Sequence, residues 1–148
     1  MPSEPPRDGP PPEPPGELLL ERRTADTEDV YVERVTEAGQ VWRRTNVRAT
    51  LAGGDWSFEA KEPAWEHLGT LAPGALAVLR ATVAGSGVED VADEHAPSAA
   101  VIGGTEEQWR IATPAGPRTI RVHGRPVTRV PALEALAEAL DEAVGAVE

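Results

Sequence analysis

Hydrophobic and polar residues alternate along the first third of the chain, and this pattern predicts strands. Residues 18–23, 30–35 and 41–51 are rich in Leu, Val and Thr, and residues 37–40, Glu-Ala-Gly-Gln, separate the second run from the third with a turn signal. Side chains of a strand alternate between its two faces, so each run has one face toward a core. The second and third runs therefore predict a β-hairpin.

The third run has two different faces. Val41, Val47 and Leu51 share one parity with Arg43 and Thr45, so the predicted inward face is uniformly apolar only at its far end. Trp42 shares the opposite, polar parity and is expected on the exposed side. Gly53-Gly54 then turns the chain into a strand over residues 55–61, where Trp56, Phe58 and Ala60 alternate with polar residues. Trp56 is expected to be buried in the core.

Helical spacing begins after Pro63. We expect a short helical turn over residues 64–68, a helix over residues 73–83 and a final amphipathic helix over residues 131–147. In the final helix the apolar stripe consists of Leu133, Leu136, Ala137, Leu140 and Val144, and acidic residues hold the outer side.

A second hairpin is predicted between the two long helices. Trp109 and Ile111 pair by parity with Ile120 and Val122 across a turn at residues 114–117. The opposite face of this hairpin is polar and basic and carries Arg110, Thr119, Arg121 and His123. The acidic stretch before it, residues 88–105, is long for a connector and is expected to be a functional or mobile loop in which Val88 and Val91 anchor the packing.

This order of elements predicts an α+β fold in which two helices pack on one face of a mainly antiparallel sheet. Residues 1–16 contain eight of the fifteen prolines and almost no large apolar residue, so we expect a Pro-rich disordered tail there. Residues 17–148 are then a single domain.

Acidic and basic residues are concentrated in different predicted elements. Residues 85–108 carry six acids and no Lys or Arg, residues 110–130 carry five Arg and no acid, and residues 131–148 carry five acids and no base. The net charge of −11 argues against a nucleic-acid or anionic-membrane partner. The chain shows no signal segment or membrane span, and we expect a cytoplasmic protein.

No motif specifies a reaction. The chain has no Cys, which excludes disulfides and thiolate chemistry. His67, His95 and His123 lie far apart, and Ser86 lacks the glycine spacing of a nucleophile elbow. Asp90, Asp93 and Glu94 precede His95, which leaves open whether this stretch binds a cation. We therefore expect no enzyme activity, no cofactor and no catalytic residue.

Exposed Trp and Arg residues are the candidates for binding a partner, because these two types are enriched in interface hot spots. Trp42 and Trp65 lie among charged neighbours. The candidate partner-binding residues are Trp42, Arg44, Arg48, Arg110 and Arg121.

Part of the chain resembles the emfourin-like family. The resemblance covers about half of the chain, and it rests on residues 71–79, 87–91, 109–111, 118–122 and 131–144, a helix, loop, hairpin and final helix in sequence. That family includes small inhibitors of thermolysin-type metallopeptidases. The resemblance implies a peptidase inhibitor, but it carries over no inhibitory residue.

These observations lead to one main hypothesis and two alternatives. The main hypothesis is a non-enzymatic protein-binding or regulatory module, in its sharpest form an inhibitor of a thermolysin-type metallopeptidase. The first alternative is an acidic immunity or antitoxin-like protein that neutralises a basic, toxin-like partner through charge complementarity. The second is a small-ligand-binding domain or an enzyme of unknown reaction.

Overall fold

The structure is a computed structural model that describes residues 14–25, 30–96, 105–125 and 130–147. Its elements, in chain order, are β1 (Leu18–Ala25), β2 (Val30–Thr36), β3 (Gln40–Ala52), β4 (Asp55–Thr70), α1 (Pro73–Ala84), the short 3-10 helix η1 (Val88–Asp90), β5 (Glu94–His95), β6 (Thr105–Thr113), β7 (Gly116–Arg125) and α2 (Pro131–Val147). Of the expected tail, residues 1–13 lie outside these ranges, and Pro14 is buried.

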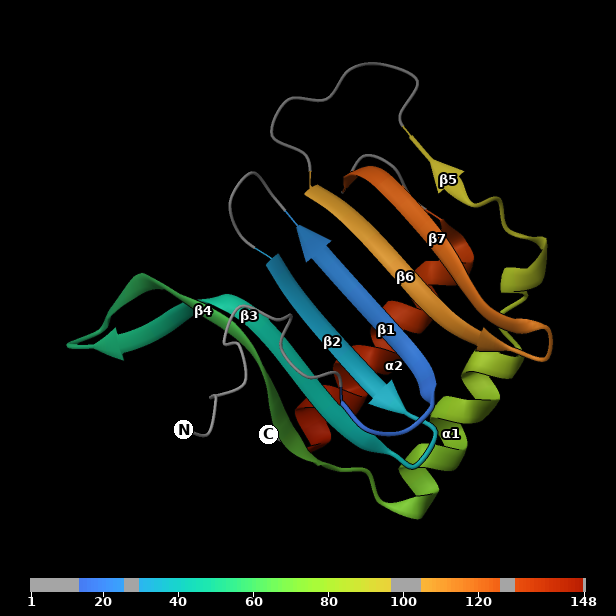
Figure 1. Cartoon of the computed structure of the whole chain (residues 1–148), viewed down its shortest axis with the longest axis horizontal. Coiled ribbons are helices and arrows are strands. Elements are labelled where there is room, and N and C mark those ends of the chain that lie inside the picture. Colours follow the sequence, from blue (N-terminus) through green and yellow to red (C-terminus); the bar gives the residue numbers. More distant parts are fainter. Residues whose placement is uncertain (1–13, 26–29, 97–104, 126–129, 148) are drawn as a thin grey trace, which may run out of the picture.

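The strands form one seven-stranded sheet in the order β4-β3-β2-β1-β6-β7-β5. All neighbours pair antiparallel except β5, which pairs parallel with β7. Both helices pack on one face of the sheet, and α2 runs behind the strands in Figure 1. The predicted α+β fold is confirmed.

The core lies between the helices and this face. Trp109, Ile111 and Ile120 are fully buried on β6 and β7, where the alternation predicted them. From α2, Leu136 and Leu140 are fully buried against them. Val88, the expected anchor of the acidic stretch, is also buried. The other face of the sheet carries no helix of the described chain, and we call it the open face.

The short helical turn expected over residues 64–68 is wrong. These residues belong to β4, which continues to Thr70 and pairs with β3, so that Trp65 lies opposite Arg44 and His67 opposite Trp42. Pairing with a neighbouring strand overrides the weak local preference for a helix. The register shifts between Ala60 and Ala64, and Pro63 lies within this irregularity, where a residue without an N–H is tolerated.

The expected burial of Trp56 and the inward position of Leu51 are also wrong. The last part of β3 and the first part of β4, residues 47–52 and 55–60, project beyond the rest of the sheet as a two-stranded ribbon that we call the arm (Figure 1). Trp56 is 62% exposed and Leu51 is 56% exposed. The alternation correctly predicts that one face is apolar, but no helix of the described chain covers that face.

Neither helix of the described ranges is both long and apolar enough to cross a membrane.

Candidate functional site: the arginine groove

Two rows of side chains cross the open face because neighbouring strands hold them in register. The first row runs through Arg110, Glu21, Arg34, Trp42 and His67 on β6, β1, β2, β3 and β4. The second row, two residues along each strand, runs through Arg121, Gln108, Arg23, Val32, Arg44 and Trp65 on β7, β6, β1, β2, β3 and β4. Strand pairing therefore gathers arginines from five strands on one surface.

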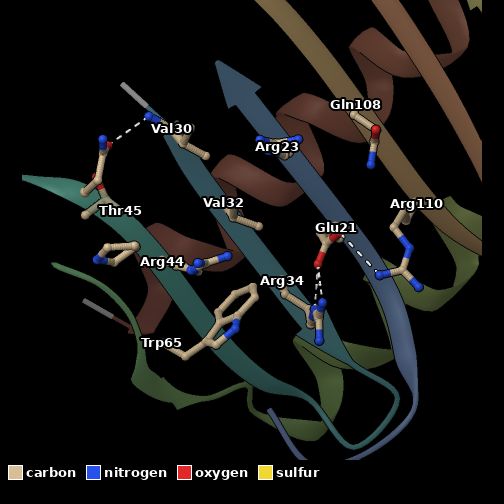
Figure 2. Close-up of a pocket in the computed structure, with 12 residues that line it drawn as sticks. Glu21, Arg23, Val30, Val32, Arg34, Arg44, Thr45, Trp65, Gln108 and Arg110 are labelled. Carbon is tan, nitrogen blue, oxygen red and sulfur yellow. Dashed lines mark hydrogen bonds and ion pairs between the residues drawn. The ribbon is translucent and has the colours of Figure 1, made fainter. Parts of the chain in front are cut away.

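A hollow of about 360 Å³ lies between these rows, and we call it the arginine groove. Its lining comes from β1, β2, β3, β4 and β6 (Figure 2) and consists of Glu21, Arg23, Val30, Val32, Arg34, Arg44, Thr45, Asn46, Pro63, Trp65, Gln108 and Arg110. Four arginines thus face one carboxylate across a floor that includes two valines.

The Glu21 carboxylate forms ion pairs with two arginines of the groove. Its Oε1 lies 2.6 Å from Arg34 Nη2 and accepts a hydrogen bond from Arg34 Nε at 2.7 Å. Glu21 and Arg34 are both buried, and the Arg34 guanidinium lies 4.7 Å from the centre of the Trp65 ring. Arg110 approaches the second oxygen of Glu21 at 3.7 Å from the other side (Figure 2). The Glu21 carboxylate therefore compensates Arg34 and partly compensates Arg110.

Arg23 and Arg44 are not compensated in this way. Neither guanidinium makes an ion pair or a hydrogen bond to any residue in the described ranges, and Arg44 Nε is buried without an acceptor. A buried donor that has lost water without gaining an acceptor costs about 1–3 kcal/mol. That cost concerns Arg44, because Arg23 is exposed to solvent. An oxyanion in the groove would accept charge-assisted hydrogen bonds from both guanidinium groups.

A second hollow of about 310 Å³ adjoins the groove and shares Arg23 and Gln108 with it. Its Arg121 and His123 already have partners: Arg121 lies 3.7 Å from Glu94 and donates to Gln108 at 3.2 Å, and His123 Nδ1 lies 3.2 Å from Glu106. Among the described residues, the arginine groove therefore contains two guanidinium groups without an ion pair, those of Arg23 and Arg44, whereas the second hollow contains only that of Arg23.

Trp42 lies on the open face beside the groove without lining it. Its ring packs against His67 with centroids 4.9 Å apart and planes tilted by 55°. The indole Nε1 is buried and has no acceptor among the described residues.

The structure brings together most of the predicted partner-binding residues. Arg44 and Arg110 line the arginine groove, Trp42 borders it, and Arg121 lines the adjoining hollow. Arg48 is separated from them because it lies beyond the register shift, on the exposed arm opposite Glu59.

Sequence reasoning missed Arg23 and Arg34 as groove residues. Each alternates with inward-facing neighbours on its own strand, so the period of two already places them on a polar face. What the sequence does not contain is the pairing of β1 with both β2 and β6, which sets Arg23 beside Val32 and Gln108. That pairing joins segments far apart in the chain.

The acidic stretch does not form a metal site within the described chain. Asp93 pairs with Arg118 at 2.9 Å, Glu94 with Arg121 at 3.7 Å, and His95 Nε2 lies 2.9 Å from the carbonyl oxygen of Ala92. No three His, Asp or Glu side chains of the described residues are grouped so that they could hold a metal ion. The carboxylates of Asp93 and Glu94 bind this stretch to the arginines of β7.

Comparison with known proteins adds no further constraint on the site: no family model, curated protein or solved structure matches the chain.

Proposed function

We propose that this chain is a non-enzymatic protein-binding module that receives an acidic segment of a partner protein in the arginine groove. The observation that carries the proposal is the uncompensated pair Arg23 and Arg44, held in one hollow of a chain whose net charge is −11. A carboxylate from the partner supplies a charged acceptor, which neither guanidinium group has among the described residues.

The groove also favours a partner segment with an apolar side chain. Val30 and Val32 contribute apolar surface and Trp65 an aromatic side chain, which is held in place by its contact with Arg34. Small sites of this composition bind through apolar contact and use a few polar groups for orientation. An acidic segment that carries one Leu, Phe or similar residue fits both features.

The charge of the rest of the molecule contributes specificity. The outer side of α2 carries Glu134, Glu138, Asp141 and Glu142. These acids repel an acidic partner from the helix side, so the arginine groove is the approach that remains favourable. A nucleic acid is a poorer candidate because it would need many phosphate contacts on a strongly acidic chain.

The direct test is the binding of a short fluorescein-labelled oligoglutamate peptide that contains one Leu, followed by fluorescence anisotropy at low and moderate salt. We expect Arg44→Ala and Arg23→Ala each to weaken binding roughly tenfold, the loss of one charge-assisted hydrogen bond. Arg48→Ala is the matched control, because Arg48 lies on the same strand, carries the same charge and is outside the groove. Equal losses in all three variants, or no binding at low salt, would refute the proposal.

Inhibition of a thermolysin-type metallopeptidase is the particular regulatory role that the emfourin-like resemblance implies. Titration of such a peptidase with the chain, using a fluorogenic peptide substrate, tests this role separately. If the groove holds the peptidase, Arg44→Ala raises the inhibition constant and Arg48→Ala leaves it unchanged. If the chain does not inhibit the peptidase at all, the inhibitor role is refuted. The oligoglutamate experiment then still tests ligand binding in the groove.

A further inference from the structure

The arm is the largest exposed apolar feature of the described chain. Leu51, Trp56 and Phe58 are 56%, 62% and 69% exposed, and all three belong to the arm. β2 pairs with β3 only as far as Thr45, so beyond that residue β4 is the only strand of the described chain that pairs with β3. A bare two-stranded ribbon is marginally stable in water, and exposed apolar surface of this kind commonly marks a contact site.

The arm has one apolar face and one polar face. Leu51 lies directly opposite Trp56 in the register, which puts the two side chains on the same face, and Phe58 follows on that face two residues along β4. The opposite face carries Arg48, Thr50, Ser57 and Glu59, paired as Arg48 with Glu59 and Thr50 with Ser57. The apolar residues therefore form a surface rather than isolated exposed positions.

A cavity lies at the base of the arm, whereas bulky side chains protrude at its tip. A cavity of about 440 Å³ at the base is lined by Tyr31, Arg43, Thr45, Val47, Arg48, Phe58, Lys61 and Glu66. The Arg48 side chain therefore reaches the rim of this cavity although its position on β3 belongs to the polar face of the arm. Val47 and Leu51 have the same parity on β3, so the cavity and the bulky tip residues Leu51 and Trp56 belong to the same side of the sheet. The surface thus presents a protruding end and a receiving end.

Charge opposes a second copy of this chain less at the arm than over the chain as a whole. Residues 47–52 and 55–60 of the arm carry Arg48 against Asp55 and Glu59, a net charge of −1, whereas the whole chain has a net charge of −11. Two copies therefore repel each other only weakly at their arms. A two-fold arrangement also requires a self-complementary surface, in which a protruding end meets a receiving end twice.

We propose that two copies of this chain associate through their arms, antiparallel across a two-fold axis. The Trp56 ring of each copy enters the basal cavity of the other and packs on Val47 and Phe58, and the two apolar faces cover each other. This interface lies on the helix side of the sheet, so both arginine grooves stay open in the dimer. The inference is independent of the proposed function.

Sedimentation equilibrium of the full chain over a wide concentration range tests the proposal. We expect a monomer–dimer equilibrium whose dissociation constant rises at least about tenfold in Trp56→Glu, because a central aromatic residue dominates such an interface. The controls are Thr50→Glu, on the polar face of the same arm, and Val78→Glu, at an apolar position of α1 that is 65% exposed. Both should dimerise like the wild type, and far-UV circular dichroism should show that every variant is folded.

A second measurement locates the interface. The natural chain has no Cys, so Thr50→Cys accepts a single spin label on the polar face of the arm. In the dimer, electron–electron double resonance should give one defined distance between labels, and the additional change Trp56→Glu should abolish it. A wild-type chain that stays monomeric, or a dimer that Trp56→Glu leaves intact, overturns the proposal.

Discussion

Arg22 and the buried Glu33 form a partly buried ion pair on the helix-covered face of the sheet, with 2.5 Å between Arg22 Nη2 and Glu33 Oε1. The two residues lie opposite each other on β1 and β2. Asp141 of α2 approaches the same Arg22 nitrogen at 2.6 Å, and the guanidinium lies 5.6 Å from the centre of the Trp109 ring. Arg22 therefore ties α2 to the sheet at the margin of the core.

This pair predicts a pH dependence of stability. Burial raises the pKa of Glu33 above its ordinary value of 4.5, and Arg22 reduces this effect without cancelling it. The folded protein therefore holds the Glu33 proton more tightly than the unfolded chain does, and this carboxyl contributes stability that is lost as pH rises from 4.5 through the raised pKa.

Glu33→Gln removes that titration. We expect the free energy of unfolding of the variant, relative to the wild type, to increase as pH rises through this window, measured by urea denaturation at a series of pH values. The same change at the exposed Glu59 controls for the substitution itself. A relative stability of Glu33→Gln that decreases with rising pH would show that pairing with Arg22 outweighs burial.

A charged residue introduced on the buried face of α2 is expected to lower the free energy of unfolding strongly. Leu140 is fully buried in the core, whereas Ala135 on the same helix is exposed. Leu140→Asp removes apolar packing and buries an unpaired carboxylate, so it should lower the free energy of unfolding by at least about 4 kcal/mol or prevent folding. Ala135→Asp should change it by less than about 1 kcal/mol. Similar losses in the two variants would contradict the assigned buried face of α2.

Two glycines near the C-terminal end of α2 predict opposite effects of the same substitution. A Cβ added at Gly69 on β4 would lie 2.9 Å from Val147 Cβ, whereas one added at Gly145 within α2 would have nothing within 4 Å. Gly69→Ala should therefore destabilise the fold by about 1–3 kcal/mol through overpacking. Gly145→Ala should stabilise it by up to about 1 kcal/mol because it favours the helix. Thermal denaturation of both variants checks the two signs.

The buried indole N–H of Trp42 has no acceptor among the described residues, so replacing Trp42 by Phe is expected to cost less stability than the same change at Trp109. Trp42 Nε1 has no acceptor among the described residues, whereas Trp109 Nε1 donates to Glu107 at 2.5 Å and its ring is fully buried. Trp42→Phe keeps a ring against His67 and removes an unsatisfied donor, so it should cost at least about 1 kcal/mol less than Trp109→Phe. Equal costs in chemical denaturation would mean that the Trp42 N–H has a partner, such as an ordered water.

Local patterns predict much of this fold. The alternation around Trp109 and Ile120 correctly places both in the core, and the stripe with Leu136 and Leu140 correctly gives the buried face of α2. These predictions succeed because burial of one face imposes a period on the residues of a single element. The basic face of the second hairpin, with Arg110 and Arg121, follows from the same rule.

Local patterns fail where the outcome depends on a distant segment. The same alternation that buries Trp109 leaves Trp56 exposed, because a helix covers the strand of Trp109 and no described helix reaches the arm. Residues 64–68 look helical in isolation, yet pairing with β3 makes them part of a strand. In both cases a neighbour that is distant in the chain decides the result.

The amino-acid sequence by itself determines which side chains share a face, the two long helices, the absence of Cys and the strong negative charge. Only the tertiary structure decides that Arg23, Arg34, Arg44 and Arg110 meet around Glu21 and Trp65, because strand order and register bring five separate strands together. The physical reason is that periodicity acts within one element, whereas strand pairing selects neighbours by the burial that the whole sheet gains.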